Sequence, residues 1–427
     1  MGRIIRRQAR SSCRVGYENA CQPNPANVRS TLTPLTARSA ANSATIVPSD
    51  MEPITHFLTG ACIGRAGLNR KTAYATMAAV LAAEAADLDV VWGFAGPVEG
   101  LKHHRGITHT LIAAPFVAAA AVGATWLYSR WRQHRRARRL ATLPPPEPGA
   151  PQRAQPQPTR WWWVYISALI SSFSHVLLDW TNNYGVRPFY PFNPRWYAGS
   201  FVFIAEPVMW ALLFAALIIP GIFGLAEREI SSRRTATPFR GRGLAIFALS
   251  GIFLLWCFRY VQHAQAESLV RNNPVTLDTV DRIGVEPYPW NPFRWHVIVE
   301  TPGYYQFAEV NTRTDDIESD SQTDQMYKPR YTAAVETAKQ TSLGKVYLDW
   351  GSWAVVSDIG QVQLVGVDPP RLPPGRTWTT VEFTDLRFGY DFRGTGSTRP
   401  PSGLTGAVYI VNGKEEAGME MGGREQK

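Results

Sequence analysis

The chain has 427 residues, a formal net charge of +10 and four cysteines, and a length of this kind allows two or three structural units. The cysteines, Cys13, Cys21, Cys62 and Cys257, lack metal-ligand spacing, which excludes a disulfide framework and a thiolate zinc site. Residues 263–427 hold 22 acidic and 16 basic residues, so the basic excess precedes them. Because it lies beside apolar segments, it indicates the cytoplasmic loops of a membrane protein and no nucleic-acid partner.

The first 50 residues contain seven arginines and only two acidic residues. Arg-rich, acid-poor leaders occur in transit peptides. We favour a disordered extension or a mis-assigned start with Met51 as the true first residue, because the recognisable pattern begins there.

Five stretches approach the length of about 20 apolar residues that a membrane-spanning helix needs. They are residues 73–95, 109–129, 161–180, 201–226 and 243–262. The first is the weakest, because Glu84, Asp87 and Asp89 interrupt it. Residues 54–68 are too short to span comfortably and predict a re-entrant, interfacial or tilted helix. Residues 51–262 are therefore expected to form a polytopic transmembrane helical bundle.

The arginines between these spans predict which loops face the cytoplasm. Six follow residue 129, before a Pro-rich linker at about 140–160, and five lie in the loop at 227–242. Both loops should be cytoplasmic, and the two spans that separate them place them on the same side. This topology puts the ionisable residues of the apolar region at the outer face of the inner membrane. They are Asp87, Asp89, His104, His109, His175, Asp179 and Glu206, joined by His56 if a short N-terminus is exported.

Residues 263–427 would then form a small, β-rich extracytoplasmic domain. Residues 294–300 and 304–310 flank Thr301-Pro302-Gly303, a pattern typical of a hairpin. Further strand-like runs lie near 345–366, 377–389 and 406–412, and a ragged tail rich in Gly and Glu is expected to follow. The fold class is thus mainly α, with a polytopic transmembrane helical bundle and this C-terminal domain.

The spacing of the ionisable residues suggests how they could meet. His175 and Asp179 are four residues apart and share a helix face, where they could bind one ion or simply form a hydrogen-bonded pair. Asp87 and Asp89 can act together only if the helix ends or unwinds there, which Gly93 and Gly96-Pro97 make plausible. An ordinary polar helix end is the alternative.

The stretch from His104 to His109 should form a turn. Gly106 interrupts the helix, and Thr108 is the expected N-cap of the next span. Arg105 could orient an anionic substrate, pair with a carboxylate or face lipid headgroups. The remaining histidines fall outside the pattern, with His103 facing solvent. They are His103, His134, His263 and His296.

So many buried ionisable groups are costly without compensation, which a divalent cation would supply. Histidine and aspartate are ligands of zinc and of two-metal sites, so we expect one or two divalent ions, with zinc favoured. The candidate metal ligands are His56, Asp87, Asp89, His104, His109, His175 and Asp179. These are too many for one zinc, so some must orient ligands, act as a base or bind a second ion.

Four segments together resemble the YdjM-type inner-membrane proteins, which are described as membrane-bound metal-dependent hydrolases. They are Met51-Glu-Pro-Ile-Thr-His-Phe-Leu-Thr-Gly60, Ala86-Asp-Leu-Asp89, His104-Arg-Gly-Ile-Thr-His109 and Ser174-His-Val-Leu-Leu-Asp179. The resemblance covers about 51–262, and Pro289-Trp-Asn-Pro-Phe-Arg-Trp295 resembles the outer domain of longer members. Three positions depart from the family pattern. Ala86 replaces a usual Pro, Thr110 a common Ser, and Glu206 a common Asp.

Together these observations predict a membrane-bound metal-dependent hydrolase with membrane lipids as its partners. Asp87, Arg105 and Glu206 are the candidate catalytic residues. Metal-activated water would attack a lipid or lipid-linked ester or phosphoester at the outer face of the membrane. Two other classes stay open: an ion or proton transporter, and a non-catalytic membrane scaffold with a structural metal.

Overall fold

The computed structural model describes residues 52–142, 157–230, 241–321, 323–364, 366–390 and 404–426. The Arg-rich segment 1–50 and the start at Met51 lie outside these residues. So do most of the Pro-rich linker at 140–160 and most of the basic loop at 227–242.

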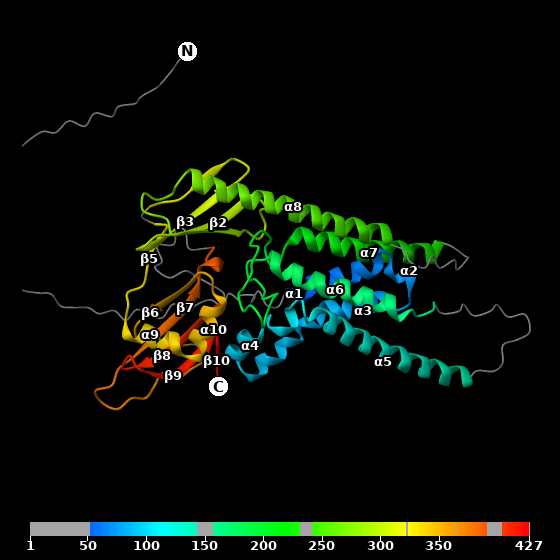
Figure 1. Ribbon diagram of the computed structural model, residues 1–427, viewed down its shortest axis with the longest axis horizontal. Helices are drawn as coiled ribbons and strands as arrows, with labels where there is room; N and C mark the ends of the chain where they lie inside the picture. The colour runs from blue at the N-terminus through cyan, green and yellow to red at the C-terminus, as the bar shows by residue number, and fades with distance from the viewer. Residues whose placement is uncertain are drawn as a thin grey trace, which may run out of the picture. The chain divides into compact units, whose positions relative to one another are not determined.

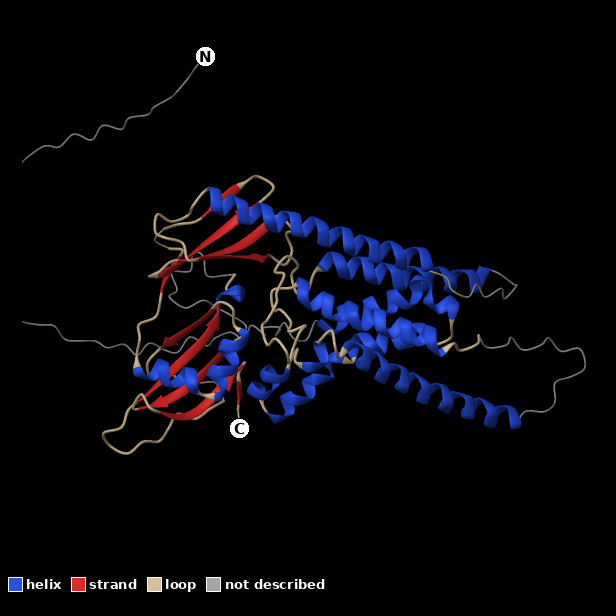
Figure 2. Ribbon diagram, viewed as in Figure 1, coloured by secondary structure: helices blue, strands red, loops and turns tan. Residues whose placement is uncertain are grey.

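The N-terminal half of the described chain is mainly helical (Figures 1 and 2). In chain order its elements are α1 (Glu52–Ile63), the π-helix η2 (Gly64–Leu68), α2 (Asn69–Lys71), α3 (Ala75–Glu84), the 3-10 helix η3 (Ala86–Ala95), α4 (Pro97–His103), the 3-10 helix η4 (Ile107–His109), α5 (Ala114–Ala141), α6 (Trp161–Thr181), α7 (Pro207–Ile230) and α8 (Arg242–Asn272).

Among the described residues, three helices are long and apolar enough to cross a membrane: α6, Pro207–Leu225 of α7, and α8. Pro97–His109 and Ala114–Ala141 would add a fourth span, bent by 89° at the break between them. The stretches predicted at 161–180, 201–226 and 243–262 therefore do form apolar helices. Their crossing of a membrane stays a prediction.

Two predicted spans are not continuous helices. In the stretch 73–95, α3 ends at Glu84 and the backbone tightens into η3, where the two aspartates turn toward residues distant in sequence. In the stretch 109–129, α5 begins only at Ala114. Thr108 is not its N-cap, because the Ala113 amide instead donates to Oγ1 of Thr110, at 3.0 Å.

Helix α5 also continues to Ala141, so the six arginines after residue 129 extend the helix instead of forming a loop. Arginine is a good helix former, which explains the extension. Helix α8 likewise continues to Asn272, past the end of its apolar stretch.

Small residues let the helices approach closely. A Cβ atom on Gly60 would lie 2.8 Å from the Ala79 carbonyl oxygen, and one on Gly64 would lie 2.4 Å from the Thr76 Cα. The Ser167 hydroxyl donates to the carbonyl of Ala75 at 2.8 Å, which ties α6 to α3. Close packing of small side chains is the usual basis of helix association in membranes.

The C-terminal part contains two antiparallel five-stranded sheets. The first is ordered β1-β2-β3-β4, with β5 also paired to β3. Its strands are β1 (Arg282–Pro287), β2 (Arg294–Glu300), β3 (Tyr304–Asn311), β4 (Asp316–Glu318) and β5 (Gln325–Tyr327). The predicted hairpin is confirmed, since β2 pairs with β3 in the register Glu300 to Tyr305. Ala266 and Val270 of α8 share a core with this sheet.

The second sheet is ordered β10-β9-β8-β7-β6. Its strands and associated helices are α9 (Ala333–Gln340), α10 (Ser342–Trp350), β6 (Ala354–Asp358), β7 (Trp378–Asp385), the 3-10 helix η5 (Leu386–Phe388), β8 (Thr405–Val411), β9 (Glu415–Met421) and β10 (Arg424–Glu425). The run predicted as strand at 345–366 is thus partly helix, and the expected ragged tail forms β9 and β10. The runs at 377–389 and 406–412 do contain strands.

The second sheet and α10 hold the connection between α6 and α7. Nη1 of Arg387 donates to the Asn183 carbonyl at 2.7 Å, and Nη1 of Arg187 lies 3.3 Å from the Asp349 carboxylate. The Tyr184 ring packs against the Trp350 ring at a centroid distance of 4.9 Å. The C-terminal part therefore fixes the segment that directly follows the end of α6.

Candidate metal centre

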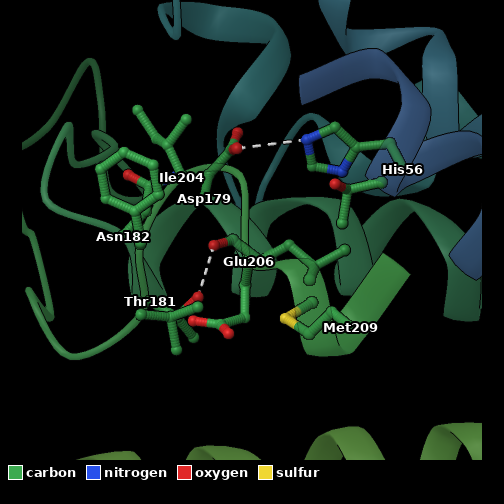
Figure 3. Close-up of a pocket in the computed structure, with 11 residues that line it drawn as sticks. His56, Asp179, Thr181, Asn182, Ile204, Glu206 and Met209 are labelled. Atoms are coloured by element: carbon green, nitrogen blue, oxygen red, sulfur yellow. Dashed lines mark hydrogen bonds and ion pairs between the residues drawn. The ribbon is translucent and has the colours of Figure 1, made fainter. Parts of the chain in front are cut away.

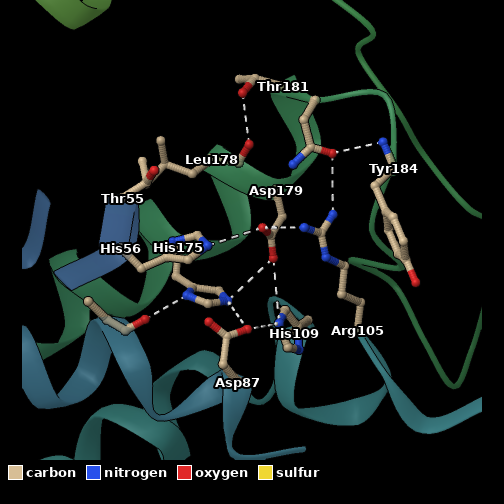
Figure 4. A network of polar contacts seen from close by, with 12 residues as sticks. Thr55, His56, Asp87, Arg105, His109, His175, Leu178, Asp179, Thr181 and Tyr184 are labelled. Atoms are coloured by element: carbon tan, nitrogen blue, oxygen red, sulfur yellow. Dashed lines mark hydrogen bonds and ion pairs between the residues drawn. The ribbon is translucent and has the colours of Figure 1, made fainter. Parts of the chain in front are cut away.

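Four separate segments bring their ionisable side chains to one place (Figure 4). They are α1, η3, the turn around η4, and the C-terminal end of α6. The side chains that meet there are His56, Asp87, Asp89, Arg105, His109, His175 and Asp179.

His175 and Asp179 lie on one face of α6, as their spacing predicts. Nδ1 of His175 is 2.6 Å from the Ala83 carbonyl oxygen. A carbonyl can only accept, so Nδ1 carries the proton and Nε2 carries a lone pair. That Nε2 points into the cluster, 3.3 Å from Oδ2 of Asp179. The end of α3 thus fixes the ring in the tautomer that a metal ligand needs.

His109 is held in the same way. Its Nδ1 lies 3.1 Å from the Thr108 hydroxyl and 3.3 Å from Oδ2 of Asp89. Its Nε2 lies 3.2 Å from Oδ1 of Asp87 and 3.5 Å from Oδ2 of Asp179. A histidine whose far nitrogen bonds to a carboxylate is a common arrangement around bound metals, because the carboxylate orients the ring.

The central atoms fit a small cation. The four side chains are Asp87, His109, His175 and Asp179, and their neighbouring donor atoms are separated by 3.2, 3.5, 3.3 and 3.6 Å. A tetrahedral zinc with bonds of about 2.0–2.1 Å places its ligands about 3.3–3.4 Å apart. His175 belongs to two candidate ligand triads, one with Asp87 and His109 and one with His56 and Asp179.

The cluster also leaves polar atoms unsatisfied. Within the described residues, Nε2 of His175, Oδ2 of Asp179 and Oδ2 of Asp87 are buried and make no hydrogen bond. An unsatisfied buried polar atom costs about 1–3 kcal/mol, and more if it is charged. A cation among the central donor atoms would satisfy Nε2 of His175 and Oδ2 of Asp179, so the residues present fit a metal ion.

Arg105 lies behind Asp179 and is fully buried. Its Nη2 is 3.0 Å from Oδ1 of Asp179, and its Nη1 donates to the Gly185 carbonyl at 2.7 Å. Of the three roles considered for Arg105, the structure therefore favours pairing with a ligating carboxylate. With Oδ1 held by Arg105, the other oxygen of Asp179 faces the centre.

Asp89 and His104 lie beside the centre rather than in it. Oδ1 of Asp89 is 3.2 Å from Nδ1 of His104, and Oδ2 accepts from the Arg105 amide at 2.9 Å. Burial raises the pKa of Asp89, but hydrogen bonds to His104 and His109 outweigh it and lower the pKa. For Asp87, burial raises the pKa, but the hydrogen bond to His109 outweighs it, and the pKa falls to about 2. Both carboxylates are thus ionised at neutral pH.

His56 reaches the centre from α1. Its Nε2 is 3.3 Å from Oδ1 of Asp179, and its ring stacks on His175 with centroids 3.8 Å apart. It therefore shares Oδ1 of Asp179 with Arg105. His56 could complete a second ion-binding group with His175 and Asp179.

Glu206 does not join the donor cluster. Its carboxylate lies 3.6 Å from Nη2 of Arg259. It lines a cavity of about 20 Å³ that His56 and Asp179 also line (Figure 3). That volume suffices for one water molecule.

The other histidines lie elsewhere. His103 pairs with Glu99 at 3.3 Å and has a side chain 37% exposed, whereas His134 is exposed on α5. His263 contacts the Val285 carbonyl, and His296 is buried in β2.

Sequence reasoning missed three supporting groups: the Thr108 hydroxyl, the Ala83 carbonyl and the side chain of Asn182, whose Oδ1 accepts from Arg105 at 3.3 Å. A backbone carbonyl leaves no signal in a sequence. Asn182 follows Asp179 by three residues, and its position at the end of α6 was the available clue.

A family model, YdjM inner membrane protein, matches residues 51–266. The chain belongs to this family. The match confirms the resemblance on which the YdjM assignment rested, and it includes every candidate site residue. No curated protein and no solved structure was found to match the chain. The geometry of this YdjM member must therefore carry the functional argument.

Proposed function

We propose that this YdjM protein is a membrane-bound metal-dependent hydrolase of a lipid or lipid-linked ester or phosphoester. The observation that carries the proposal is a pair of overlapping ligand groups that meet at His175 near the end of α6. One group adds Asp87 and His109, the other adds His56 and Asp179, and the donor atoms within each group lie within 4.8 Å of one another. The tautomer of His175 that the Ala83 carbonyl fixes supports it, because it directs the Nε2 lone pair of His175 toward the donor cluster.

His109, His175 and Asp179 are the residues that would hold the ion, since their side chains are at most 1% exposed. Bound there, a divalent ion such as zinc would lower the pKa of a water molecule and polarise the scissile bond. Asp87 is 17% exposed, which makes it the most exposed of the four central side chains. It can complete the ligand set or accept a proton from the attacking water.

A neighbouring cavity favours an anionic substrate. It has a volume of about 230 Å³ and is lined by Lys102, His103 and Arg187. Asp89 and Thr108, which contact His109 of the centre, also line it. Lysine and arginine are the usual partners of phosphate oxygens. A phosphoester headgroup in this cavity would lie beside the ligands of the centre.

The surface next to the centre suits a lipid. On η3 the side chains of Leu88, Val90 and Phe94 are 65%, 69% and 93% exposed. Such an apolar patch on a membrane protein is expected at a bilayer boundary. We therefore propose that a lipid reaches the site laterally, along η3.

We also propose that the metal centre lies at the outer face of the inner membrane. His109 lies just before α5, whereas Arg138 and Arg139 lie in its last turn. Basic residues are retained on the cytoplasmic side, so the opposite end with the centre would face outward. Labelling of single cysteines placed at either end of α5, by a membrane-impermeant reagent on intact cells, tests this orientation.

A hydrolysis assay tests the activity. Detergent-purified protein loaded with zinc is incubated with phosphatidylglycerol, phosphatidic acid and a neutral diacylglycerol in mixed micelles, and released products are quantified. We expect hydrolysis by the wild type and by Glu415→Gln, an exposed control on β9, and loss of hydrolysis in Asp87→Asn. Retained zinc in inactive Asp87→Asn would assign Asp87 to proton transfer. Zinc-loaded wild type that cleaves none of the three would overturn the proposal for these lipid classes.

One observation favours a second candidate, a scaffold with a structural metal. Four protein donors lie around the centre, with His–Asp distances of 3.2–3.6 Å, and a site that protein ligands close completely is typically structural. Substitution with cobalt separates the two. A visible spectrum that changes on addition of azide indicates an open coordination position, and an unchanged spectrum indicates a closed one.

A further inference from the structure

A second cavity lies at the other end of the helical part. Its volume is about 580 Å³, and it is bounded by η2 and α2, the beginning of α6 and the beginning of α8. Trp163 lines it, whereas His175 of the metal centre lies 12 residues later on α6. At a rise of about 1.5 Å per residue, Trp163 is about 18 Å from His175 along the helix, and Ile170, the lining residue of α6 nearest to His175 in sequence, is about 7.5 Å from it. They share no residue.

The rim of this cavity is cationic. Arg70 and Lys71 end α2 and Arg242 begins α8, and all three line the cavity. Among the described residues that line the cavity, none is acidic. Nε of Arg242 donates to the Ala66 carbonyl at 3.2 Å, which places its guanidinium across η2. This rim is complementary to an anion.

The walls of the cavity are apolar. Ile63, Ile170 and Leu249 line it below the rim, and Trp163 lies near the cations, with Nζ of Lys71 5.8 Å from the centre of its ring. Ile170 is 46% exposed on α6, one of the helices apolar enough to cross a membrane. A tryptophan and cationic residues at one level, above an exposed apolar wall, are typical of a membrane interface.

We propose that this cavity binds one anionic phospholipid of the surrounding bilayer. Its phosphate lies among Arg70, Lys71 and Arg242, and an acyl chain runs along Ile170 and Leu249. The volume is within the range of ligand sites, about 300–1,000 Å³. Basic pockets between membrane helices recognise anionic headgroups by this combination of charge and apolar depth. A free phosphate would use the rim but leave the apolar wall uncovered.

The experiment measures lipid binding by the full-length protein in neutral detergent. Phosphatidylglycerol or phosphatidylcholine is added, and retained lipid is counted by native mass spectrometry. Arg70→Gln/Lys71→Gln removes two rim charges at exposed positions. Arg138→Gln/Arg139→Gln removes two exposed charges from α5 and is the matched control. Ile170→Trp fills the apolar wall without changing the charge.

We expect one phosphatidylglycerol per wild-type chain and weaker retention of phosphatidylcholine. At roughly fivefold per basic residue, the double rim variant should bind phosphatidylglycerol about 25-fold more weakly. Ile170→Trp should also weaken binding, and the α5 control should match the wild type. Inorganic phosphate at millimolar concentration should not displace the lipid.

Equal retention of the two lipids, or equal weakening by the rim variant and the α5 control, would overturn the proposal. Displacement by inorganic phosphate would instead identify a site for a soluble anion. Thermal unfolding confirms that each variant is folded. No variant in this experiment alters the metal centre. Weakened binding in the rim variant but not in the α5 control is therefore assigned to this cavity, and it is distinguishable from failure of the hydrolase proposal, which the hydrolysis assay measures.

Discussion

Replacing Arg105 by methionine should destabilise the metal-free protein, because it leaves the buried Asp179 carboxylate without the guanidinium that pairs with it. The guanidinium is fully buried and lies 3.0 Å from Oδ1 of Asp179, whose side chain is 1% exposed. Methionine keeps much of the volume of the side chain but removes the charge. The Asp179 carboxylate then stays buried with its main positive partner gone, and the Gly185 carbonyl loses a donor.

The size of the effect follows from this burial. Breaking a buried ion pair by removing one partner costs about 3–5 kcal/mol. At about 2–4 °C per kcal/mol for a domain of this size, the melting temperature of the metal-free protein should fall by roughly 6–20 °C. A bound divalent cation supplies positive charge to the same carboxylate, so the loss should be smaller when metal is present.

The assay is thermal unfolding in detergent, with a chelator and with added zinc. Arg135→Met is the matched control, because Arg135 is exposed on α5 and its guanidinium lies over the Trp131 ring. It should change stability by no more than about 0.5 kcal/mol. Arg105→Met/Asp179→Asn should be less destabilised than the sum of the single variants, because neither charge then remains unpaired. Additive losses, or a melting temperature of Arg105→Met equal to that of the control, would refute the reasoning.

Three further predictions concern separate parts of the chain. Asp89→Asn should weaken metal binding by about 10–100-fold, because Asp89 orients His109. Glu99→Gln should not weaken it, because Glu99 lies on α4 and pairs with Lys102, away from the donor atoms. Isothermal titration measures both affinities. Burial raises the pKa of Glu286 to about 8, so the folded protein holds a proton that the unfolded chain releases near pH 4.5. As the pH rises from about 4.5 to about 8, the free energy of unfolding should therefore fall by up to about 1.4 kcal/mol per pH unit. In Glu286→Gln this pH dependence should be smaller, which thermal unfolding at a series of pH values measures. Gly64→Ala should destabilise the protein by about 1–3 kcal/mol in thermal unfolding, because its Cβ would lie 2.4 Å from the Thr76 Cα.

Each of these predictions has an outcome that contradicts it. Equal metal affinity of Asp89→Asn and Glu99→Gln would remove the orienting role of Asp89. An unchanged pH slope in Glu286→Gln would mean that another group titrates. For Gly64, the control is Gly123→Ala on α5, where a Cβ meets nothing within 4 Å. Equal stability of these two variants would show that η2 can move away from α3 without cost.

Much of the fold could be predicted because it depends on local pattern. Apolar length identified α6, α7 and α8, and a Pro-Gly turn between alternating residues identified β2 and β3. Helix α10 was predicted as strand because Val346, Tyr347 and Trp350 favour strands. Yet Leu343, Tyr347 and Trp350 are buried at helical spacing, and the Thr341 hydroxyl accepts from the Gly344 amide as an N-cap. The spacing of these three apolar residues is visible in the sequence and would have predicted a helix.

The strand β9 was missed for a similar reason. Asn412 and Gly413 have φ angles of 50° and 69°, the conformation of a tight hairpin turn, and Asn-Gly is its strongest sequence signal. The break between α3 and η3 is different. No glycine or proline lies at Ala85 or Ala86, and the tight backbone brings Asp87 to His109, a contact that spans 22 residues. Local propensity cannot reveal such a break.

The meeting of the site residues could be anticipated from charge topology, but their roles could not. Asp89, Arg105 and His104 were grouped with the other candidates, and only the distances show that they support His109 and Asp179. The contact between the Ala83 carbonyl and Nδ1 of His175 could be found only from the structure, because any residue type has a backbone carbonyl.

Metal content tests the central claim most directly. The full-length protein is purified in detergent without chelator, dialysed against zinc and measured by mass spectrometry of its metals, beside His175→Ala, Asp87→Ala and the Glu99→Gln control. His175 is the most informative position, because it belongs to both candidate ligand groups. We predict at least one divalent ion per chain in the wild type and the control, and loss of the ion in folded His175→Ala. Negligible metal in every protein, or equal metal in wild type and His175→Ala, would contradict the account.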